Sequence, residues 1–208
     1  FDRTSSGSVG VGGAPGDTEI AVADLAKITT SDTLTIGGAN TTDITVADNT
    51  TLSRDDGGIT FDAINDIFIG NNVIIDVGAN NFNGTITLNS SDTASDDNDI
   101  TIGTNAHLNA NGGDVVINAP DGVLDIGEGT DIAATRDVAF EIEGEISVAG
   151  SLSAGRFLDI KTGDGAEGQA IETVAEGVNG VGVVWRAADD GHGIGQDRAV
   201  ARPLGMAL

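Results

Sequence analysis

The sequence predicts an all-β protein built as a right-handed parallel β-solenoid. Three observations support this prediction. Short runs of alternating apolar and polar residues recur over residues 30–160, Gly, Asn and Asp separate them, and the runs return at a nearly constant distance when taken two at a time. Alternation with a period of two is typical of a strand with one buried face. A fixed repeat of about 20–25 residues is typical of stacked coils.

The predicted strands follow one another with irregular single steps. Two successive steps together mostly span 19 to 25 residues, which predicts two strands per coil of about 22 residues. The predicted strands are Leu34–Ile36, Ile44–Val46, Ile59–Phe61, Ile67–Ile69, Val73–Val77, Ile86–Leu88, Ile100–Ile102, Val115–Ile117, Val123–Ile126, Val138–Phe140, Ile146–Val148 and Leu158–Ile160.

A coil with so few aliphatic residues cannot bury them alone. Stacking a further coil at about 4.8 Å continues each sheet and closes the core. Residues 30–160 would then form roughly six coils. A β-sandwich is the alternative, because the dipeptides Asn83-Gly84, Asn111-Gly112 and Asp121-Gly122 suit two-residue hairpin turns.

The composition fits thin aliphatic layers and limits the function. Hydrophobic residues make up 39% of the 208 residues but aromatic residues only 3%, and there are 31 Gly and no Cys. The net charge of −24 repels nucleic acid and anionic lipid, so we expect neither as a partner. No apolar run is long enough for membrane insertion. Without cysteine, a thiol enzyme and a Cys-ligated zinc site are excluded.

Three segments are predicted. Residues 1–18 are rich in Gly and Ser and indicate a flexible or docking N-terminal arm. Residues 19–162 form the β-solenoid. Residues 163–208 carry apolar residues at helical spacing and three of the seven Arg, and we expect a C-terminal cap or a subunit-contact segment that covers the open sheet edges.

Four runs within residues 30–163 resemble the degenerate repeats of filamentous-haemagglutinin-like bacterial adhesins. The resemblance implies a right-handed β-helix that is secreted and extends from the cell surface, without catalytic residues. The four runs are Asp66–Asp76, Gly113–Ala119, Arg136–Ile142 and Gly155–Ile160.

One loop is a candidate Ca²⁺ site. Asp92, Asp96, Asp97 and Asp99 gather within eight residues, and hard carboxylate oxygens at short spacing suit Ca²⁺. No EF-hand loop surrounds them, so a solvated acidic loop is the alternative. No cofactor is certain from the sequence, and Ca²⁺ is the candidate.

Two other motifs carry less weight. Gly163–Gly168 matches the dinucleotide fingerprint, but Asp164 and Glu167 would face the pyrophosphate, and no βαβ repeat surrounds the motif. His107 and His192 each lack a second ligand at metal-binding spacing. With no Tyr, no Cys and no G-x-S-x-G elbow, we expect that the chain is not an enzyme. A polysaccharide-active β-helix enzyme is the remaining catalytic alternative.

Threonine and asparagine add two minor hypotheses. The pairs Thr33/Thr35 and Thr85/Thr87 have the spacing of ice-binding solenoids, but two pairs do not make a regular array. Four asparagines begin N-x-[ST] sequons, which in a chain rich in Thr and Asn arise by chance as well. These asparagines are Asn40, Asn49, Asn83 and Asn89.

Together these features predict an extracellular structural or adhesive protein at the cell surface. It would be a rod segment or the subunit of a self-assembling filament or surface layer. The expected partners are further copies of the chain or a glycan of a host or cell surface. A Ca²⁺-dependent module that binds carbohydrate or another surface is the alternative within the same class.

Overall fold

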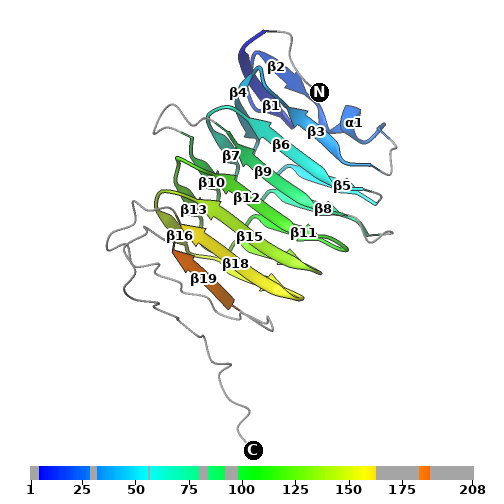
Figure 1. Ribbon diagram of the computed structural model, residues 1–208. Coiled ribbons are helices and arrows are strands. Elements are labelled where there is room, and N and C mark those ends of the chain that lie inside the picture. The colour runs from blue at the N-terminus through cyan, green and yellow to red at the C-terminus, as the bar shows by residue number, and fades with distance from the viewer. Residues whose placement is uncertain are drawn as a thin grey trace, which may run out of the picture.

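The protein is a parallel β-solenoid. The computed structural model describes residues 5–28, 32–55, 57–79, 84–91, 98–162 and 183–187, and their strands lie in three parallel sheets (Figure 1). Every strand pairing among these residues is parallel. The predicted solenoid is therefore confirmed. The β-sandwich alternative, which requires antiparallel hairpins, is wrong.

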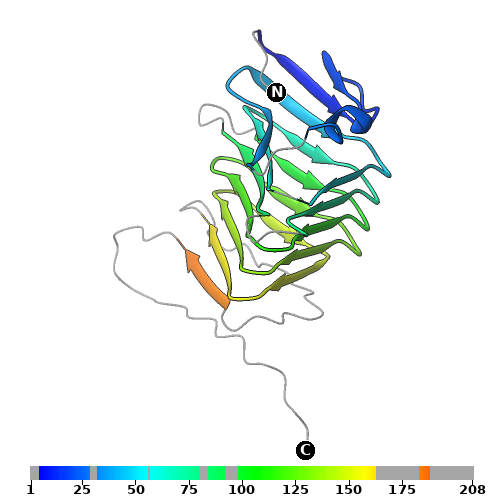
Figure 2. The same ribbon diagram turned by 90° about the vertical axis from the view of Figure 1, so that its right-hand side faces the viewer.

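The chain visits the sheets in the repeating order B, A, C, so the coils stack along one axis (Figure 2). Sheet A consists of β2 (Thr18–Ile20), β1 (Gly7–Val11), β4 (Thr41–Val46), β7 (Ile67–Ile69), β10 (Ile100–Ile102), β13 (Leu124–Ile126) and β16 (Ile146–Val148). Sheet B consists of β3 (Leu34–Gly37), β6 (Ile59–Ala63), β9 (Ile86–Ser90), β12 (Val115–Ala119), β15 (Asp137–Ile142), β18 (Phe157–Thr162) and β19 (Val183–Ala187). Sheet C consists of β5 (Thr51–Arg54), β8 (Ile74–Val77), β11 (His107–Ala110), β14 (Asp131–Ala134) and β17 (Ser151–Ala154).

Each complete coil has three strands, whereas the spacing analysis predicted two. The missed strands are β5, β11, β14 and β17 of sheet C, four residues long with one large buried aliphatic residue each. A single Leu or Ile followed two positions later by Ala, or by Arg54 in β5, gives too weak an alternation to be recognised. Only β8 of this sheet was predicted, because Val73 extends its apolar run.

The core consists of aliphatic columns that run through the stack. In sheet A, one column contains Ile44, Ile67, Ile100, Leu124 and Ile146, which pair in register and are all buried. Fully burying one such side chain stabilises the fold by about 1.5–3 kcal/mol. Since each column continues from coil to coil, every inner coil is stabilised by both of its neighbours.

Asparagine shapes the turn between sheets A and C. Asn49, Asn72 and Asn105 occupy equivalent positions with φ of 58°, 53° and 53°, and Gly129 follows with φ of 71°. Asn and Gly adopt this left-handed conformation more readily than other residues. The backbone N–H of each Asn donates to a carbonyl of the next coil, at 2.8 to 2.9 Å. The turn is thereby repeated in register along the stack.

The N-terminal end is closed by the chain itself. Residues 7–11, predicted as part of an arm, form β1, which pairs with both β4 and β2 and buries Val9 and Val11. The short helix α1 (Val22–Leu25) follows β2 and buries Leu25. On β5, Arg54 occupies the position of Val77 in the next coil and donates to the carbonyl oxygens of residues 28 and 32, at 3.5 and 3.2 Å. Arg54 therefore joins the cap segment to the first strand of sheet C.

At the other end, β16 and β17 are the last described strands of sheets A and C, while sheet B continues to β19. The predicted cap or subunit-contact segment, residues 163–208, lies outside the described residues except for β19. Among the described residues, no helix is long and apolar enough to span a membrane.

Candidate functional site

The predicted Ca²⁺ ligands fall largely in a loop outside the described residues, which include only Asp99 of the four. The backbone N–H of Asp99 donates to Asp66 Oδ1 at 3.0 Å, and Asp99 Oδ1 accepts the N–H of Val123 at 2.9 Å. One coil earlier, the N–H of Asp66 donates to Asp43 Oδ1 at 3.5 Å. Asp99 thus belongs to a ladder in which each carboxylate accepts an N–H group of the next coil. No group of three or more His, Asp or Glu residues suited to a metal ion occurs in the described part of the chain.

A second ladder lies at the start of the sheet B strands. Thr85 Oγ1 accepts the N–H of Asp114 at 3.3 Å, Asp114 Oδ1 accepts the N–H of Asp137 at 3.0 Å, and Asp137 Oδ1 accepts the N–H of Phe157 at 3.2 Å. Hydrogen bonds from backbone N–H to a carboxylate are stronger than neutral ones. The carboxylates of Asp114 and Asp137 therefore stabilise the contact between successive coils.

Two arginines and an exposed phenylalanine lie on this second ladder. We call Asp114, Arg136, Asp137, Arg156 and Phe157 the corner patch. Arg156 donates to both carboxylate oxygens of Asp137, at 3.1 and 2.5 Å, and Arg136 lies 3.6 Å from Asp114. Phe157 is 53% exposed. The patch combines an aromatic face with hydrogen-bonding groups held in fixed positions.

The pKa of the Arg156 guanidinium is raised, mainly by its hydrogen bond to Asp137 and further by the negative charges of Asp137 and Asp114. Arg156 therefore stays charged under all physiological conditions.

The sequence contained one signal for this patch. An Arg precedes the apolar run in both Arg136-Asp-Val and Arg156-Phe-Leu. Only the register of β15 on β18, which pairs Asp137 with Phe157, shows that these residues lie side by side.

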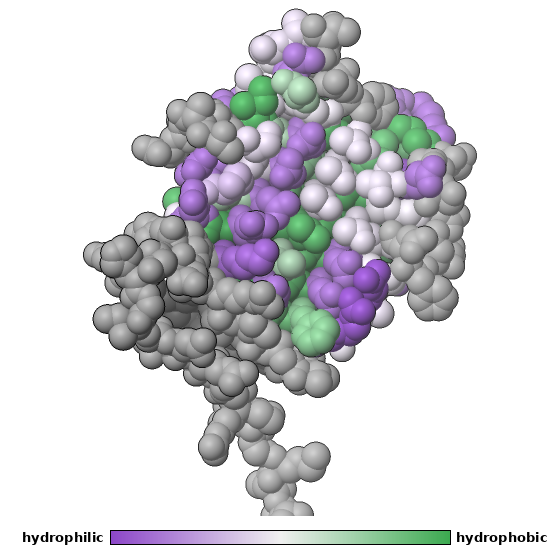
Figure 3. Space-filling view, in the orientation of Figure 1, coloured by the Kyte–Doolittle hydropathy of each residue, from purple (hydrophilic) through white to green (hydrophobic). Residues whose placement is uncertain are grey.

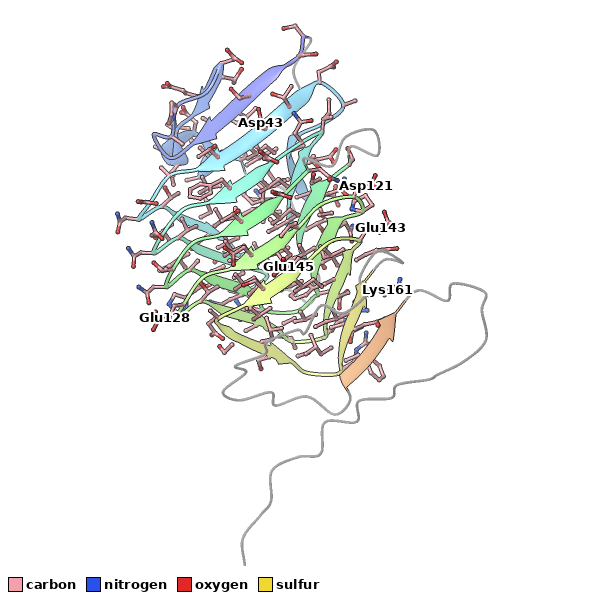
Figure 4. The ribbon with its side chains drawn as sticks, turned by 90° about the vertical axis from the view of Figure 1, so that its left-hand side faces the viewer. Asp43, Asp121, Glu128, Glu143, Glu145 and Lys161 are labelled. Atoms are coloured by element: carbon pink, nitrogen blue, oxygen red, sulfur yellow. The ribbon has the colours of Figure 1, made fainter. Side chains whose placement is uncertain are left out.

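The rest of the described surface is strongly acidic. Residues 55–135 contain 14 Asp and Glu and neither Lys nor Arg. Asp121 and Glu143 lie at one edge of sheet A and Glu128 at the opposite edge (Figure 4). In the space-filling view, hydrophilic side chains form rows that run across the stacked strands, with smaller hydrophobic areas between them (Figure 3). Such a surface attracts cations and excludes polyanions.

His107 lies on the outer face of β11, in register with Asp131 on β14. Ser151 follows on β17, and its hydroxyl donates to Asp131 Oδ1 at 2.6 Å. The acid therefore lies between the histidine and the serine, so the histidine is not positioned to take the serine proton as the base of a hydrolase triad. His192 and the Gly163–Gly168 motif lie outside the described residues.

Threonine forms one short row on sheet B. Thr35, Thr60 and Thr87 pair in register, and Val116 and Ala139 continue the row. Three successive single threonines do not make the array of Thr pairs that ice-binding solenoids present.

No family model, curated protein sequence or solved structure matches this chain.

Proposed function

We propose that the chain is an extracellular structural or adhesive β-solenoid without catalytic activity. The observation that carries this proposal is how the described carboxylates on the two ladders are used. Asp43, Asp66 and Asp99 hold the coils at the start of sheet A, and Asp114 and Asp137 hold them at the start of sheet B. An active site needs titratable groups directed at a substrate, whereas these side chains hold neighbouring coils together.

Within this class, an adhesive rod has more support than a head-to-tail filament. Growth through the N-terminal end would require another chain to pair with β2, β3 and β5, the outermost described strands of sheets A, B and C at that end. β2 has only three residues and carries Glu19, and Arg54 of β5 donates to carbonyl oxygens of the cap segment. Short, charged edge strands are the usual protection of a sheet against such pairing. The first test is negative-stain electron microscopy of the purified protein. Short, separate particles support the rod, and long uniform filaments support self-assembly.

The corner patch is the surface that we propose for adhesion, with a neutral glycan as the ligand. Its two arginines face two aspartates, so the patch is nearly neutral within a chain of net charge −24, which would repel an acidic polysaccharide. The exposed ring of Phe157 offers an apolar face for a sugar ring, and the bound Arg156–Asp137 pair offers fixed polar groups beside it.

A glycan array with labelled protein tests this adhesion. Phe157→Ala should reduce binding to the preferred glycan by at least about tenfold, since burying an aromatic face contributes 1–2 kcal/mol or more. Phe68→Ala is the matched control, because Phe68 lies on sheet A and is 41% exposed. Equal binding by both variants and the unaltered chain would remove the corner patch from the proposal.

A Ca²⁺-dependent module is the second candidate, based on Asp92, Asp96, Asp97 and Asp99. Its test is the melting temperature with about 1 mM Ca²⁺ and with chelator. A ligand at 100 times its Kd stabilises a fold by about 2.7 kcal/mol. An unchanged melting temperature would exclude a structural calcium ion.

A further inference from the structure

The first turn between sheets A and C carries an N-glycosylation sequon at an exposed asparagine. The sequence is Asn49-Thr50-Thr51, and the turn connects β4 to β5. The side chain of Asn49 is exposed, as is that of Thr51, which supplies the hydroxyl that a glycosyltransferase requires two residues after the asparagine. Both groups that define the sequon are therefore accessible in the folded chain.

The amide nitrogen of Asn49 is available for reaction. Asn49 Oδ1 accepts a hydrogen bond from Asn72 Nδ2 at 3.3 Å, which orients the amide. Among the described residues, no acceptor lies within hydrogen-bond distance of Asn49 Nδ2. Asn49 has φ of 58° and lies exposed in the turn between β4 and β5, outside either strand.

The other two described sequons are less accessible. Asn89 lies within β9, and its Nδ2 donates to Asp62 Oδ1 at 2.6 Å. The hydroxyl two residues later belongs to Ser91 and donates to the carbonyl of Ala63 at 3.1 Å. Asn40 is half-buried, and its carbonyl accepts the N–H of Gly7 at 3.2 Å. Asn83 lies outside the described residues.

The place of Asn49 in the stack distinguishes it from its equivalents. The turn lies at the start of β5, the first strand of sheet C, and Asn49 itself is exposed, although Gly12 packs against the neighbouring Thr50. The equivalent Asn72 and Asn105 have Ile74 and His107 two residues later, so neither begins a sequon. Of the three turns with this asparagine, only the first therefore carries the motif.

We propose that Asn49 is an acceptor for N-linked glycan. In the reaction, the anomeric carbon of a sugar forms a bond to Asn49 Nδ2. The bond from that carbon to the phosphate oxygen of a lipid-pyrophosphate-linked donor breaks, the amide loses one proton, and the lipid pyrophosphate leaves. The natural occurrence of this modification rests on the proposed extracellular location, but the acceptor property of the folded chain does not.

The test uses purified, unglycosylated full-length protein, a single-subunit oligosaccharyltransferase and a lipid-linked oligosaccharide. Intact mass should increase by one glycan, and peptide mapping should place it on Asn49. Occupancy of Asn49 should exceed that of Asn40 and Asn89 by at least about tenfold. Breaking a hydrogen bond to a carboxylate, such as that of Asn89, lowers the reactive population by about this factor. Free peptides spanning Asn40 and Asn89 are the control, and they should accept glycan once released from the fold.

Variants separate the motif from the fold. Asn49→Gln and Thr51→Ala should abolish the modification, Thr51→Ser should retain it, and Asn89→Gln should leave it unchanged. A folded chain that accepts no glycan, or that accepts it only on another asparagine, would overturn the proposal. Because the assay uses isolated protein, it gives the same answer whether or not the chain binds glycans or forms rods.

Discussion

Two neighbouring isoleucines on β8 provide a direct test of the inward and outward faces of the solenoid. Ile75 is fully buried and pairs in register with Leu52 and Leu108, whereas Ile74 is 37% exposed. Ile75→Ala and Ile74→Ala remove the same atoms from neighbouring positions of one strand. Any difference between the two variants therefore reports burial.

The expected magnitudes differ widely. Ile75→Ala removes three buried carbon groups, worth about 2.4 kcal/mol at 0.8 kcal/mol each, and the cavity adds about 1 kcal/mol. Ile74→Ala should cost about 1 kcal/mol, because much of its side chain already contacts water. The difference of about 2.5 kcal/mol corresponds to a change of about 60-fold in the folding equilibrium constant.

Urea denaturation followed by far-ultraviolet circular dichroism measures both free energies. The slope against urea must stay constant between variants for the comparison to hold, since a solenoid can unfold coil by coil. Two variants within about 0.5 kcal/mol of each other would refute the assigned register of β8.

Three further predictions concern the turns, the cap and the charge. Asn72→Ala should lower the free energy of unfolding by about 1 kcal/mol because Ala disfavours φ of 53°, while Asn72→Gly should cost less; urea denaturation measures both, and equal losses would contradict the conformational argument. Arg54→Ala should speed hydrogen exchange of the amides of residues 22–28, because the guanidinium no longer holds the carbonyls of residues 28 and 32, while exchange in β12 stays slow. Uniform acceleration in both regions would show instead that Arg54 supports the whole stack. Raising NaCl from about 0.1 M to about 1 M should increase the melting temperature by roughly 5 °C, because it screens the repulsion within a chain of charge −24, and a decrease would contradict this explanation.

Asp99 shows that contacts between coils join residues far apart in the chain. Its sequence neighbours in the predicted Ca²⁺ site, Asp92, Asp96 and Asp97, lie outside the described residues. Among the described residues, Asp99 forms hydrogen bonds with Asp66, 33 residues earlier, and with Val123, 24 residues later. A ladder between coils joins residues one coil apart, and the coils differ in length. In sheet A the steps from Ile44 to Ile67 and from Ile67 to Ile100 are 23 and 33 residues, so no fixed offset reveals the ladder.

The sequence by itself determined the short strands with one buried face, because aliphatic residues alternate with polar ones between Gly, Asn and Asp. The two-step spacing of these runs predicted the solenoid, and the parallel pairings of the structure excluded the β-sandwich. The sequence also determined the acidic surface, which depends on composition alone. Only the tertiary structure decided the third strand of each coil, since β11 and β14 carry one large aliphatic residue each and are strands only because neighbouring coils pair with them. The closure of the N-terminal end was decided in the same way. The Gly-rich segment around Val9 has weak strand propensity, and its pairing with β4 supplies the hydrogen bonds and burial that make it a strand.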